Sequence, residues 1–400
     1  MRRIKDNTQV LSKAAITSGS FTSQIGLSEQ EADAFIDFVI DESGLKDRVR
    51  LVRMNKRSVK IDKLLLANER VLKPGVSAVD PGETVAITTE QILLESKEIV
   101  AVVRIGDDAL EDNIEGDAFA DHLLGMIARA SANQLEDALL YGRKLPSGTP
   151  TNITQLWDGW ITQVEAGGNL VDANGAGFGD RFMEREKLSK LLKALPTKFR
   201  KDKRSMNFTM ADDIDQDWAD VVLSGRATML GDNALQGDLP NRYRGVNFAP
   251  SGLIRTDRPL LVSGGGSTTL DNSEAAGSTV LEVPSTTNLA NGEFIVIARG
   301  TAKEEVRQIL SFVADISITV TEETEFQHDS GVTVEEVTAD ATDVLLGNYK
   351  NLILGIQREM TVEPDRLPRL RATDWVISMR VIPEVEEVTA LALLQNLKVK

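Results

Sequence analysis

A long apolar stripe between Asp117 and Tyr141 constrains this chain more than any other feature. Its members recur at steps of three and four residues, the period of an amphipathic α-helix. They are Phe119, Leu123, Ile127 and Ala130, widened by Ala120, Leu124, Leu135 and Ala138, with Asp121, Arg129, Asn133 and Glu136 on the other side. We expect Gly142 to end the helix by adopting a positive φ. A helix of about 40 Å can be the backbone of a plate-like subunit or a long core helix.

Size and composition indicate a folded protein. Among 400 residues, 42% are hydrophobic and 26% charged, which predicts two or three domains rather than a disordered chain. The N-terminal 20 residues carry basic residues without an apolar run behind them, so we expect a mobile arm and no secretory signal. No apolar run is long enough to span a membrane. The absence of cysteine excludes disulfides and thiolate metal sites.

The formal net charge of −16 argues against a protein that reads nucleic acid, because such affinity comes largely from lysine and arginine on phosphates. It allows a surface that faces DNA without sequence-specific binding. One local cluster is basic: Lys198, Arg200, Lys201, Lys203 and Arg204. We interpret this cluster as a solvated loop or as a contact to an acidic neighbour.

The first hundred residues predict a helix followed by an extended ribbon. Leu27 to Ser43 is amphipathic, with Ser28 as N-cap. Alternating residues from Leu45 to Ile61 and from Ala86 to Ile105 predict strands. We expect the two strands to form a ribbon that is polar on both faces. Because a lone two-stranded ribbon is marginal in water, the pattern favours packing on another molecule over folding back on its own domain.

The middle of the chain predicts mixed structure. Helices are expected at Asp180 to Leu195 and Ile214 to Leu223, and strands at Ser205 to Ala211 and Val246 to Phe248. Ser263 to Ser267 has the composition of a flexible linker. Beyond it, short strands with turn signals predict a small β-barrel or sandwich inserted into the chain. These strands are Thr279 to Val283, Glu293 to Ile297, Val306 to Phe312, Ile316 to Thr321 and Val332 to Val337.

The last sixty residues predict strands at Asp343 to Ile356, Met360 to Val362 and Trp375 to Ile382, with a turn at Pro364 to Pro368. Val388 to Val399 is an apolar tail that must be buried against something. We expect the tail and the ribbon to be buried on sister copies of the chain.

No group of residues forms a defensible active site. His122 and His328 have no evident partner, and the acidic residues from Asp107 to Asp112 fit a helix N-terminus. The run from Asp172 to Gly177 lacks the regular ligands of a calcium loop. We therefore predict no enzyme activity, no metal and no cofactor.

The order of the parts resembles the HK97-fold major capsid proteins of tailed bacteriophages. The resemblance rests on the approach ITTEQILLESKEIVAVVRIGDDALED, the helix end ASANQLEDALLYG with Glu136, Asp137, Ala138 and Gly142, and the passages ALPTKFRKDKRSMNFTMA, RATMLGDNALQGDLPNRYRGVNFAP, DVLLGNYKNLILGIQREMTVE and WVISMRVIPEV. The chain departs from the pattern at Asn348, where the family commonly has Asp or Glu. The β insertion lies outside the pattern.

The resemblance implies an α+β, HK97-like capsid fold with a long spine helix, an extended E-loop hairpin, peripheral and axial domains and an inserted small all-β domain. We expect an N-terminal arm and helix at 1–47, the E-loop at 48–90, a peripheral domain from 91–150 and 371–400, an axial domain from 151–264 and 341–370, and the insertion at 265–340.

The implied function is a structural subunit that forms hexamers and pentamers of an icosahedral shell around phage DNA, assembled in the host cytoplasm and located in the virion capsid. A scaffolding protein, a portal and a decoration protein are the implied partners, and no membrane is involved. Candidate intersubunit contacts are Lys73, Glu83, Arg226, Asp232 and Arg358. Some relatives join a lysine to a neighbour's asparagine; Lys56, Lys60, Lys63 or Lys73 and Asn351 or Asn396 could do so, but we expect ionic contacts instead.

Two other interpretations remain open. An encapsulin-type compartment shell shares the fold, and a surface enzyme with an appended β-domain is a different class. The enzyme would need a cleft with paired carboxylates of different pKa.

Overall fold

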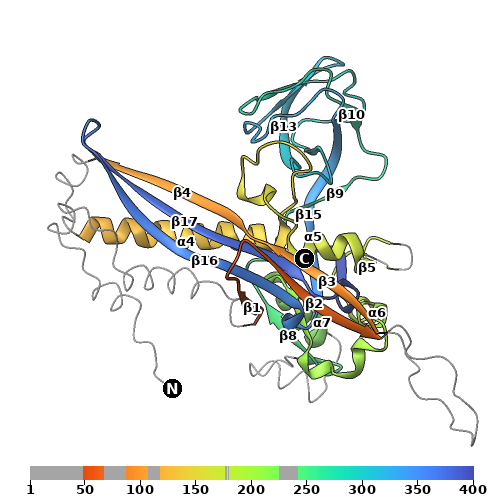
Figure 1. The fold of residues 1–400 in the computed structure, drawn as a ribbon. Coiled ribbons are helices and arrows are strands. Elements are labelled where there is room, and N and C mark those ends of the chain that lie inside the picture. Colours follow the sequence, from red (N-terminus) through yellow and green to blue (C-terminus); the bar gives the residue numbers. More distant parts are fainter. Residues whose placement is uncertain (1–47, 67–86, 107–117, 176–177, 179, 225–241) are drawn as a thin grey trace, which may run out of the picture. The chain divides into compact units, whose positions relative to one another are not determined.

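The computed structural model describes residues 48–66, 87–106, 118–175, 178, 180–224 and 242–400 (Figure 1). Helices and strands both occur, as the predicted α+β class requires. The chain divides into two compact units. Among the described residues, the first unit consists mainly of Leu51–Ala120 and Ile353–Glu386, and the second of Asp121–Leu352 and Glu387–Lys400. The predicted helix at Leu27 to Ser43 lies outside the described residues.

The first unit contains a four-stranded sheet of order β1-β16-β17-β4. Its strands are β1 (Arg50–Arg53), β16 (Leu352–Leu367), β17 (Ala372–Val385) and β4 (Lys97–Gly106). β17 and β4 pair antiparallel from Ala372↔Gly106 to Val381↔Lys97. One face of β17 is buried through Trp375, Ile377 and Val381, so the apolar run predicted as a strand is confirmed.

The predicted turn at Pro364 to Pro368 is wrong, because β16 continues to Leu367 and the turn falls at residues 368–371. The short strand β1 pairs with β16, and just after β1 the Met54 N–H donates to the Ile356 carbonyl at 2.8 Å. Among the described strands, only the four-residue β1 pairs with this side of the 16-residue β16, so most of this side is an edge. A proline, which lacks a backbone donor, is tolerated on an edge.

The ribbon consists of β2 (Ser58–Leu66) and β3 (Ile87–Glu95), which form a separate two-stranded sheet. It is not polar on both faces. The cross-strand pairs Val59↔Leu94 and Ile61↔Ile92 line one side, and Leu94 is fully buried. The Ser96 hydroxyl, just after β3, donates to Gln357 at 2.6 Å. Part of the ribbon is therefore buried on its own unit, contrary to the prediction.

The second unit contains most of the long helix α4 (Ala118–Tyr141), which confirms the helix predicted from the apolar stripe. Gly142 ends it, but not through a positive φ. A Cβ on Gly142 would lie 2.4 Å from the Ala138 carbonyl and 2.9 Å from the Trp157 carbonyl. Close approach of backbone therefore requires glycine here. Glu136, expected on the polar side, is buried.

The described strands of the second unit form a 12-stranded sheet, in which β11-β14-β13-β12-β15-β6-β8-β7 is the main order. β15 is the long strand to which most of the others attach, and β5, β9, β10 and β18 lie off the main order. The strands are β5 (Asn169–Asp172), β6 (Asn207–Met210), β7 (Arg242–Tyr243), β8 (Val246–Pro250), β9 (Arg258–Leu261), β10 (Ser267–Thr269), β11 (Val280–Glu282), β12 (Phe294–Ile297), β13 (Glu305–Val313), β14 (Ser317–Val320), β15 (Thr333–Gly347) and β18 (Ala392–Lys398).

Among the described residues of this unit there are three further helices and several single turns of 3₁₀ helix. They are α5 (Trp160–Gly167), α6 (Arg185–Ala194) and α7 (Asp212–Ser224), with η2 (Ile153–Gln155), η3 (Phe199–Lys201), η4 (Lys203–Ser205), η5 (Tyr349–Asn351) and η6 (Val388–Ala390). The predicted helix at Asp180 to Leu195 is thus shorter than expected, beginning at Arg185. The predicted helix at Ile214 to Leu223 and the strands at β6 and β8 are confirmed.

The apolar tail is buried on its own chain, so the expectation of burial on a sister copy is wrong. β18 pairs antiparallel with β15 and parallel with β5. Leu393, Leu394 and Leu397 have no exposed surface. The tail completes the core of the second unit.

The five predicted short strands between 279 and 337 are confirmed. They enclose a cluster of buried side chains: Leu270, Leu281, Val283, Leu289, Ile295, Ile297, Ala298, Ile309, Ile318, Val320 and Val334. The glycine-rich run before them is ordered rather than a flexible linker. The Gly266 N–H donates to Glu336 Oε2 at 2.8 Å, and a Cβ on Gly266 would lie 2.5 Å from Leu289. Since β9 and β12 both pair with β15, this region shares the sheet of the second unit.

Candidate interaction surfaces

Of the five predicted contact residues, four lie outside the described residues: Lys73, Glu83, Arg226 and Asp232. Arg358 lies on β16, where its Nη2 donates to Glu98 Oε1 at 2.9 Å and to the Ser378 hydroxyl at 2.6 Å. Arg380 also donates to Glu98, at 3.0 Å. The hydrogen bond from Arg380 and the charge of both arginines lower the pKa of Glu98. Arg358 is thus engaged within its own unit.

These ion pairs border an exposed apolar strip on β4. Val100 is 55% exposed and Val102 is 57% exposed, on the same side of the strand as Glu98 and Arg104. Arg104 pairs with Asp374 at 2.7 Å and lowers the pKa of that carboxyl. Two apolar residues thus lie between two ionic groups. Sequence reading missed Glu98, Asp374 and Arg380, because their pairing joins strands far apart in the chain.

A partly buried ionic cluster links α5, β9 and β15 within the second unit. Arg258 pairs with Glu165 at 2.6 Å and with Asp343, and Arg143 pairs with Glu165 at 3.2 Å. Burial raises the pKa of Asp343 to about 6, against the opposing charge of Arg258. The guanidinium of Arg258 lies 5.4 Å from the ring centre of Tyr141. Two arginines and two carboxylates therefore balance one another inside the unit.

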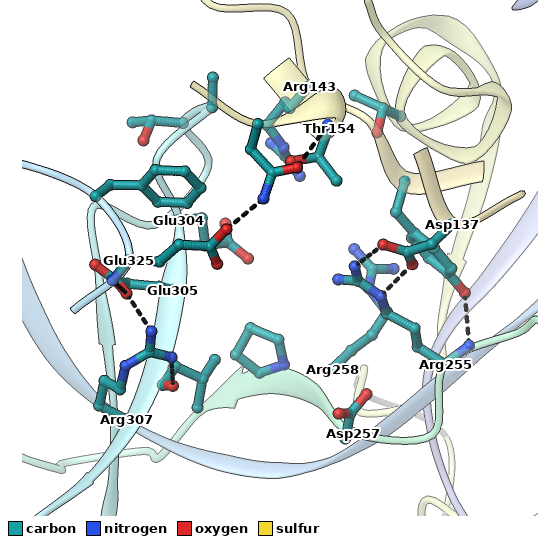
Figure 2. A pocket seen from close by; sticks show the side chains of 18 residues that line it. Asp137, Arg143, Thr154, Arg255, Asp257, Arg258, Glu304, Glu305, Arg307 and Glu325 are labelled. Carbon is teal, nitrogen blue, oxygen red and sulfur yellow. Dashed lines mark hydrogen bonds and ion pairs between the residues drawn. The ribbon is translucent and has the colours of Figure 1, made fainter. Parts of the chain in front are cut away.

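A polar pocket of about 330 Å³ lies beside this cluster (Figure 2). Its charged lining residues are Asp137, Arg143, Arg255, Asp257, Arg258, Glu304, Glu305, Arg307 and Glu325. Arg255 donates to Asp137 at 2.7 Å, and Arg307 pairs with Glu305 at 2.6 Å, as Figure 2 shows. Asn152 donates to Glu325 across the pocket. Of these pairs, the one between Asn152 and Glu325 joins the start of η2 to the region of residues 267–340.

His328, expected to be an ordinary loop residue, is completely buried and hydrogen-bonded to Glu305. Burial would raise the pKa of Glu305, but the hydrogen bonds from His328 and the Glu325 N–H, with the charge of Arg307, lower it. The backbone of His328 also pairs with Glu274. No local sequence signal links these residues, since the contact arises only when the β strands assemble.

The two cross-linking candidates among the asparagines already bind groups of their own chain. Asn351 donates to the Glu387 carbonyl at 2.8 Å, and Asn396 donates to Asp172 Oδ1 at 2.8 Å. Lys63 donates to the Glu386 carbonyl at 3.4 Å and lies 3.8 Å from Glu90. Asp172 Oδ1 accepts hydrogen bonds from the Asn396 side chain and from the Asn174 N–H, so protein groups hold this carboxylate at the start of the run from Asp172 to Gly177.

Within the described ranges, no group of three or more His, Cys, Asp or Glu could hold a metal ion. The described helices include none long and apolar enough to cross a membrane.

Comparison with known proteins gives a named sequence relative of this chain. No family model matches the chain. A Bacillus subtilis (strain 168) protein named as a prophage capsid protein, YqbE, is 30% identical over 239 residues, which are 59% of this chain and 73% of the relative. The prediction of a phage capsid protein is confirmed by this similarity.

The solved structures to which the chain shows some similarity include a GTA capsid, a satellite phage procapsid and an encapsulin complex. The capsid of the native GTA particle has a TM-score of 0.48 at 14% identity, over 89% of this chain and 90% of that one. The satellite phage P4 procapsid with its size determination protein has a TM-score of 0.49 at 11% identity, over 100% and 99%. The SrpI encapsulin complex of Synechococcus elongatus PCC 7942 has a TM-score of 0.43 at 11% identity, over 88% and 86%. The family assignment rests on YqbE.

Proposed function

The chain belongs to the family of prophage capsid proteins represented by YqbE, and from that premise we propose that it is an HK97-like major capsid protein of a tailed phage. The identity of 30% over 239 residues carries this proposal. Copies of the chain form hexamers and pentamers of an icosahedral shell around phage DNA. The role is structural, and the shell forms in the host cytoplasm with a scaffolding protein, a portal and a decoration protein as partners and becomes the capsid of the virion.

The described elements support an HK97-like arrangement. A two-stranded ribbon precedes a long helix, and a final long hairpin of β16 and β17 follows the mixed region, which is the order of E-loop, spine helix and peripheral strands. The four-stranded sheet with β4 corresponds to a peripheral domain, and β6, β8 and α7 correspond to an axial domain. Residues 265–340 correspond to an insertion with its own buried cluster.

The ribbon supports contact between copies. Its outer face pairs Lys60 with Leu93, and Leu93 is 50% exposed. A half-exposed leucine on a two-stranded sheet is stabilised when another surface covers it. The neighbouring copy supplies that surface in this proposal. Lys73 and Glu83, between β2 and β3 in the sequence, remain proposed contacts, as do Arg226, Asp232 and Arg358.

The encapsulin alternative is disfavoured, because the sequence relative is named as a prophage protein. An acidic chain with a net charge of −16 also suits a wall that faces packaged DNA without holding it.

Electron microscopy of the expressed chain and of ribbon variants tests the proposal. Deleting Ala67 to Thr84 or substituting Leu93→Glu leaves a folded, soluble subunit that does not form stable shells. Val313→Glu is the matched control, because Val313 is 54% exposed on β13, which belongs to a different sheet from the ribbon. Normal shells from both ribbon variants would contradict the E-loop assignment.

A further inference from the structure

The two strands β6 and β8 are parallel, with Asn207 opposite Asn247 and Met210 opposite Pro250. Their approaches therefore meet at one edge and their exits at the other. The chain enters β6 through η3 and η4, and it enters β8 through β7 and a tight turn at Gly245. The Asn247 side chain donates to the Arg204 carbonyl at 3.2 Å, which holds the two approaches together.

The approach edge is strongly basic. We call this set the cationic edge; it consists of Lys198, Arg200, Lys201, Lys203, Arg204, Arg242 and Arg244. Asp202 is the one carboxylate within these two approaches, residues 198–204 and 242–245. In the described part of the chain, no member of the cationic edge forms an ion pair. Lys198 and Arg244 instead lie over the rings of Phe199 and Tyr243, at 4.7 and 5.5 Å.

The exit edge carries the opposite charge. α7 begins two residues after β6 and has three aspartates in its first turn, with Asp220 further along and no basic residue in the helix. We call Asp212 and Asp213, which are exposed, the anionic edge. The Ser251 N–H donates to the Met210 carbonyl at 2.9 Å, so the exit of β8 lies at this same edge. Burial and, to a smaller extent, the charge of Asp212 raise the pKa of Asp215.

An aromatic cluster fixes the two edges relative to each other. Phe208 of β6 lies 5.6 Å from Phe248 of β8, and Trp218 of α7 lies 5.5 Å from Phe248 and 5.4 Å from Tyr243. β6 has four residues, so the edges are about 10 Å apart along the strand. One rigid element therefore presents positive charge at one end and negative charge at the other.

We propose that the cationic edge of one copy binds the anionic edge of the next copy around a capsomer ring. Different patches that meet head to tail form a heterologous interface, which closes into a ring when the rotation allows it. Opposite charge at both edges sets the direction and register of each contact. The inference rests on the proposed shell function and adds the residues that select the neighbour.

Nucleic acid is the competing occupant of the cationic edge, since phosphates also attract unpaired lysine and arginine. DNA binding would leave the anionic edge without a role. The charge complementarity within one chain favours a second copy.

A charge-swap experiment tests the inference on the full chain. Lys201→Glu with Arg204→Glu places two negative charges where the neighbour presents Asp212 and Asp213 in the proposed contact, and Asp212→Lys with Asp213→Lys places two positive charges where the neighbour presents Lys201 and Arg204. Each pair of substitutions lowers the particle yield by about tenfold or more, because like charges then meet at every contact. Combining all four substitutions restores the yield to within about twofold of the wild-type chain.

Lys144→Glu with Arg299→Glu is the control, since both residues are exposed and the change in net charge equals that of the first variant. It assembles as the wild-type chain does, and circular dichroism verifies that all variants fold. A normal particle yield from both twofold variants overturns the inference, and so does a fourfold variant whose particle yield stays low. Shells formed by the wild-type chain leave the proposed function intact in either case. Fluorescence anisotropy measures the binding of duplex DNA to the variant with Lys201→Glu and Arg204→Glu. If this variant loses DNA binding but keeps a normal particle yield, the inference is overturned and nucleic acid is the occupant of the cationic edge.

Discussion

At the scale of single residues, the structure shows constraints that residue type alone does not reveal. Gly142 was expected to adopt a positive φ, yet it is required because the Ala138 and Trp157 carbonyls approach it. His328 and Glu305 form a buried pair between strands that are distant in sequence. Asp343 is buried beside Arg258 and Glu165 although its neighbours predict an ordinary strand. Each case depends on what another segment places against the residue.

Gly142→Ala should destabilise the second unit by about 1–3 kcal/mol, because the new methyl group overlaps backbone atoms that cannot move freely. Gly167→Ala is the control, since its Cβ would lie at an ordinary 3.5 Å from Val388. The control should change the free energy of unfolding by less than about 0.5 kcal/mol. Urea unfolding of both variants measures the difference, and equal stability would contradict the close approach.

The raised pKa of Asp343 predicts a pH dependence of stability. The folded chain keeps a proton on Asp343 up to a pH of about 6, whereas an unperturbed aspartate loses it near 3.8. The folded state thus binds more protons than the unfolded state between these values, and the free energy of unfolding falls as pH rises through them. The fall is at most about 3 kcal/mol, at about 1.4 kcal/mol per pKa unit.

Asp343→Asn should remove this component, so that the wild-type chain loses stability relative to the variant between pH 4 and pH 7. Asp340 acts in the opposite sense below that range. Burial would raise its pKa, but hydrogen bonds from Lys398, Thr338 and Arg181 lower it to about 2, so its contribution is lost as pH falls below about 4. Unfolding series at pH 4, 5, 6 and 7 isolate the contribution of Asp343, because the contribution of Asp340 changes only below about pH 4. Parallel profiles of the free energy of unfolding for the wild-type chain and Asp343→Asn would contradict the account.

At the scale of elements, periodicity predicted α4, α7 and most strands, because each carries a local pattern of 3.6 or 2 residues. The same reasoning failed where contacts with distant segments of the chain determine the local structure. The ribbon has a buried side because Val59, Ile61, Ile92 and Leu94 fall on one face in the observed register. The glycine-rich run near Gly266 is ordered because Glu336 and Leu289 hold it. Of the predicted contact residues, Arg358 alone lies in the described ranges, and its partners were not evident from sequence.

The burial of β18 on its own chain yields a prediction at this scale. Leu394→Ala should cost about 2–5 kcal/mol in the isolated subunit, because a fully buried leucine leaves a cavity between β15 and β5. Leu170→Ala on β5 is the control, since Leu170 is 46% exposed, and it should cost under about 1 kcal/mol. Similar stability of both variants before assembly would mean that the tail is not buried within the free subunit.

At the scale of the whole molecule, the charge is distributed unevenly. Residues 267–340 hold fourteen carboxylates and three basic side chains, whereas the cationic edge carries seven basic side chains. In the proposed contact, neighbouring copies attract one another where the cationic edge of one meets the anionic edge of the next. The apolar tail is buried within its own chain, and the ribbon is partly buried there. In this account, contact between copies therefore rests on the exposed face of the ribbon and on the charged edges.

The central claim is that this chain is a shell subunit. Analytical ultracentrifugation of the expressed full chain at high concentration, with electron microscopy of the fast fraction, tests it most directly. The account predicts closed particles with fivefold and sixfold capsomers. A single species of 43.7 kDa at every concentration, with no particles in the images, would contradict it.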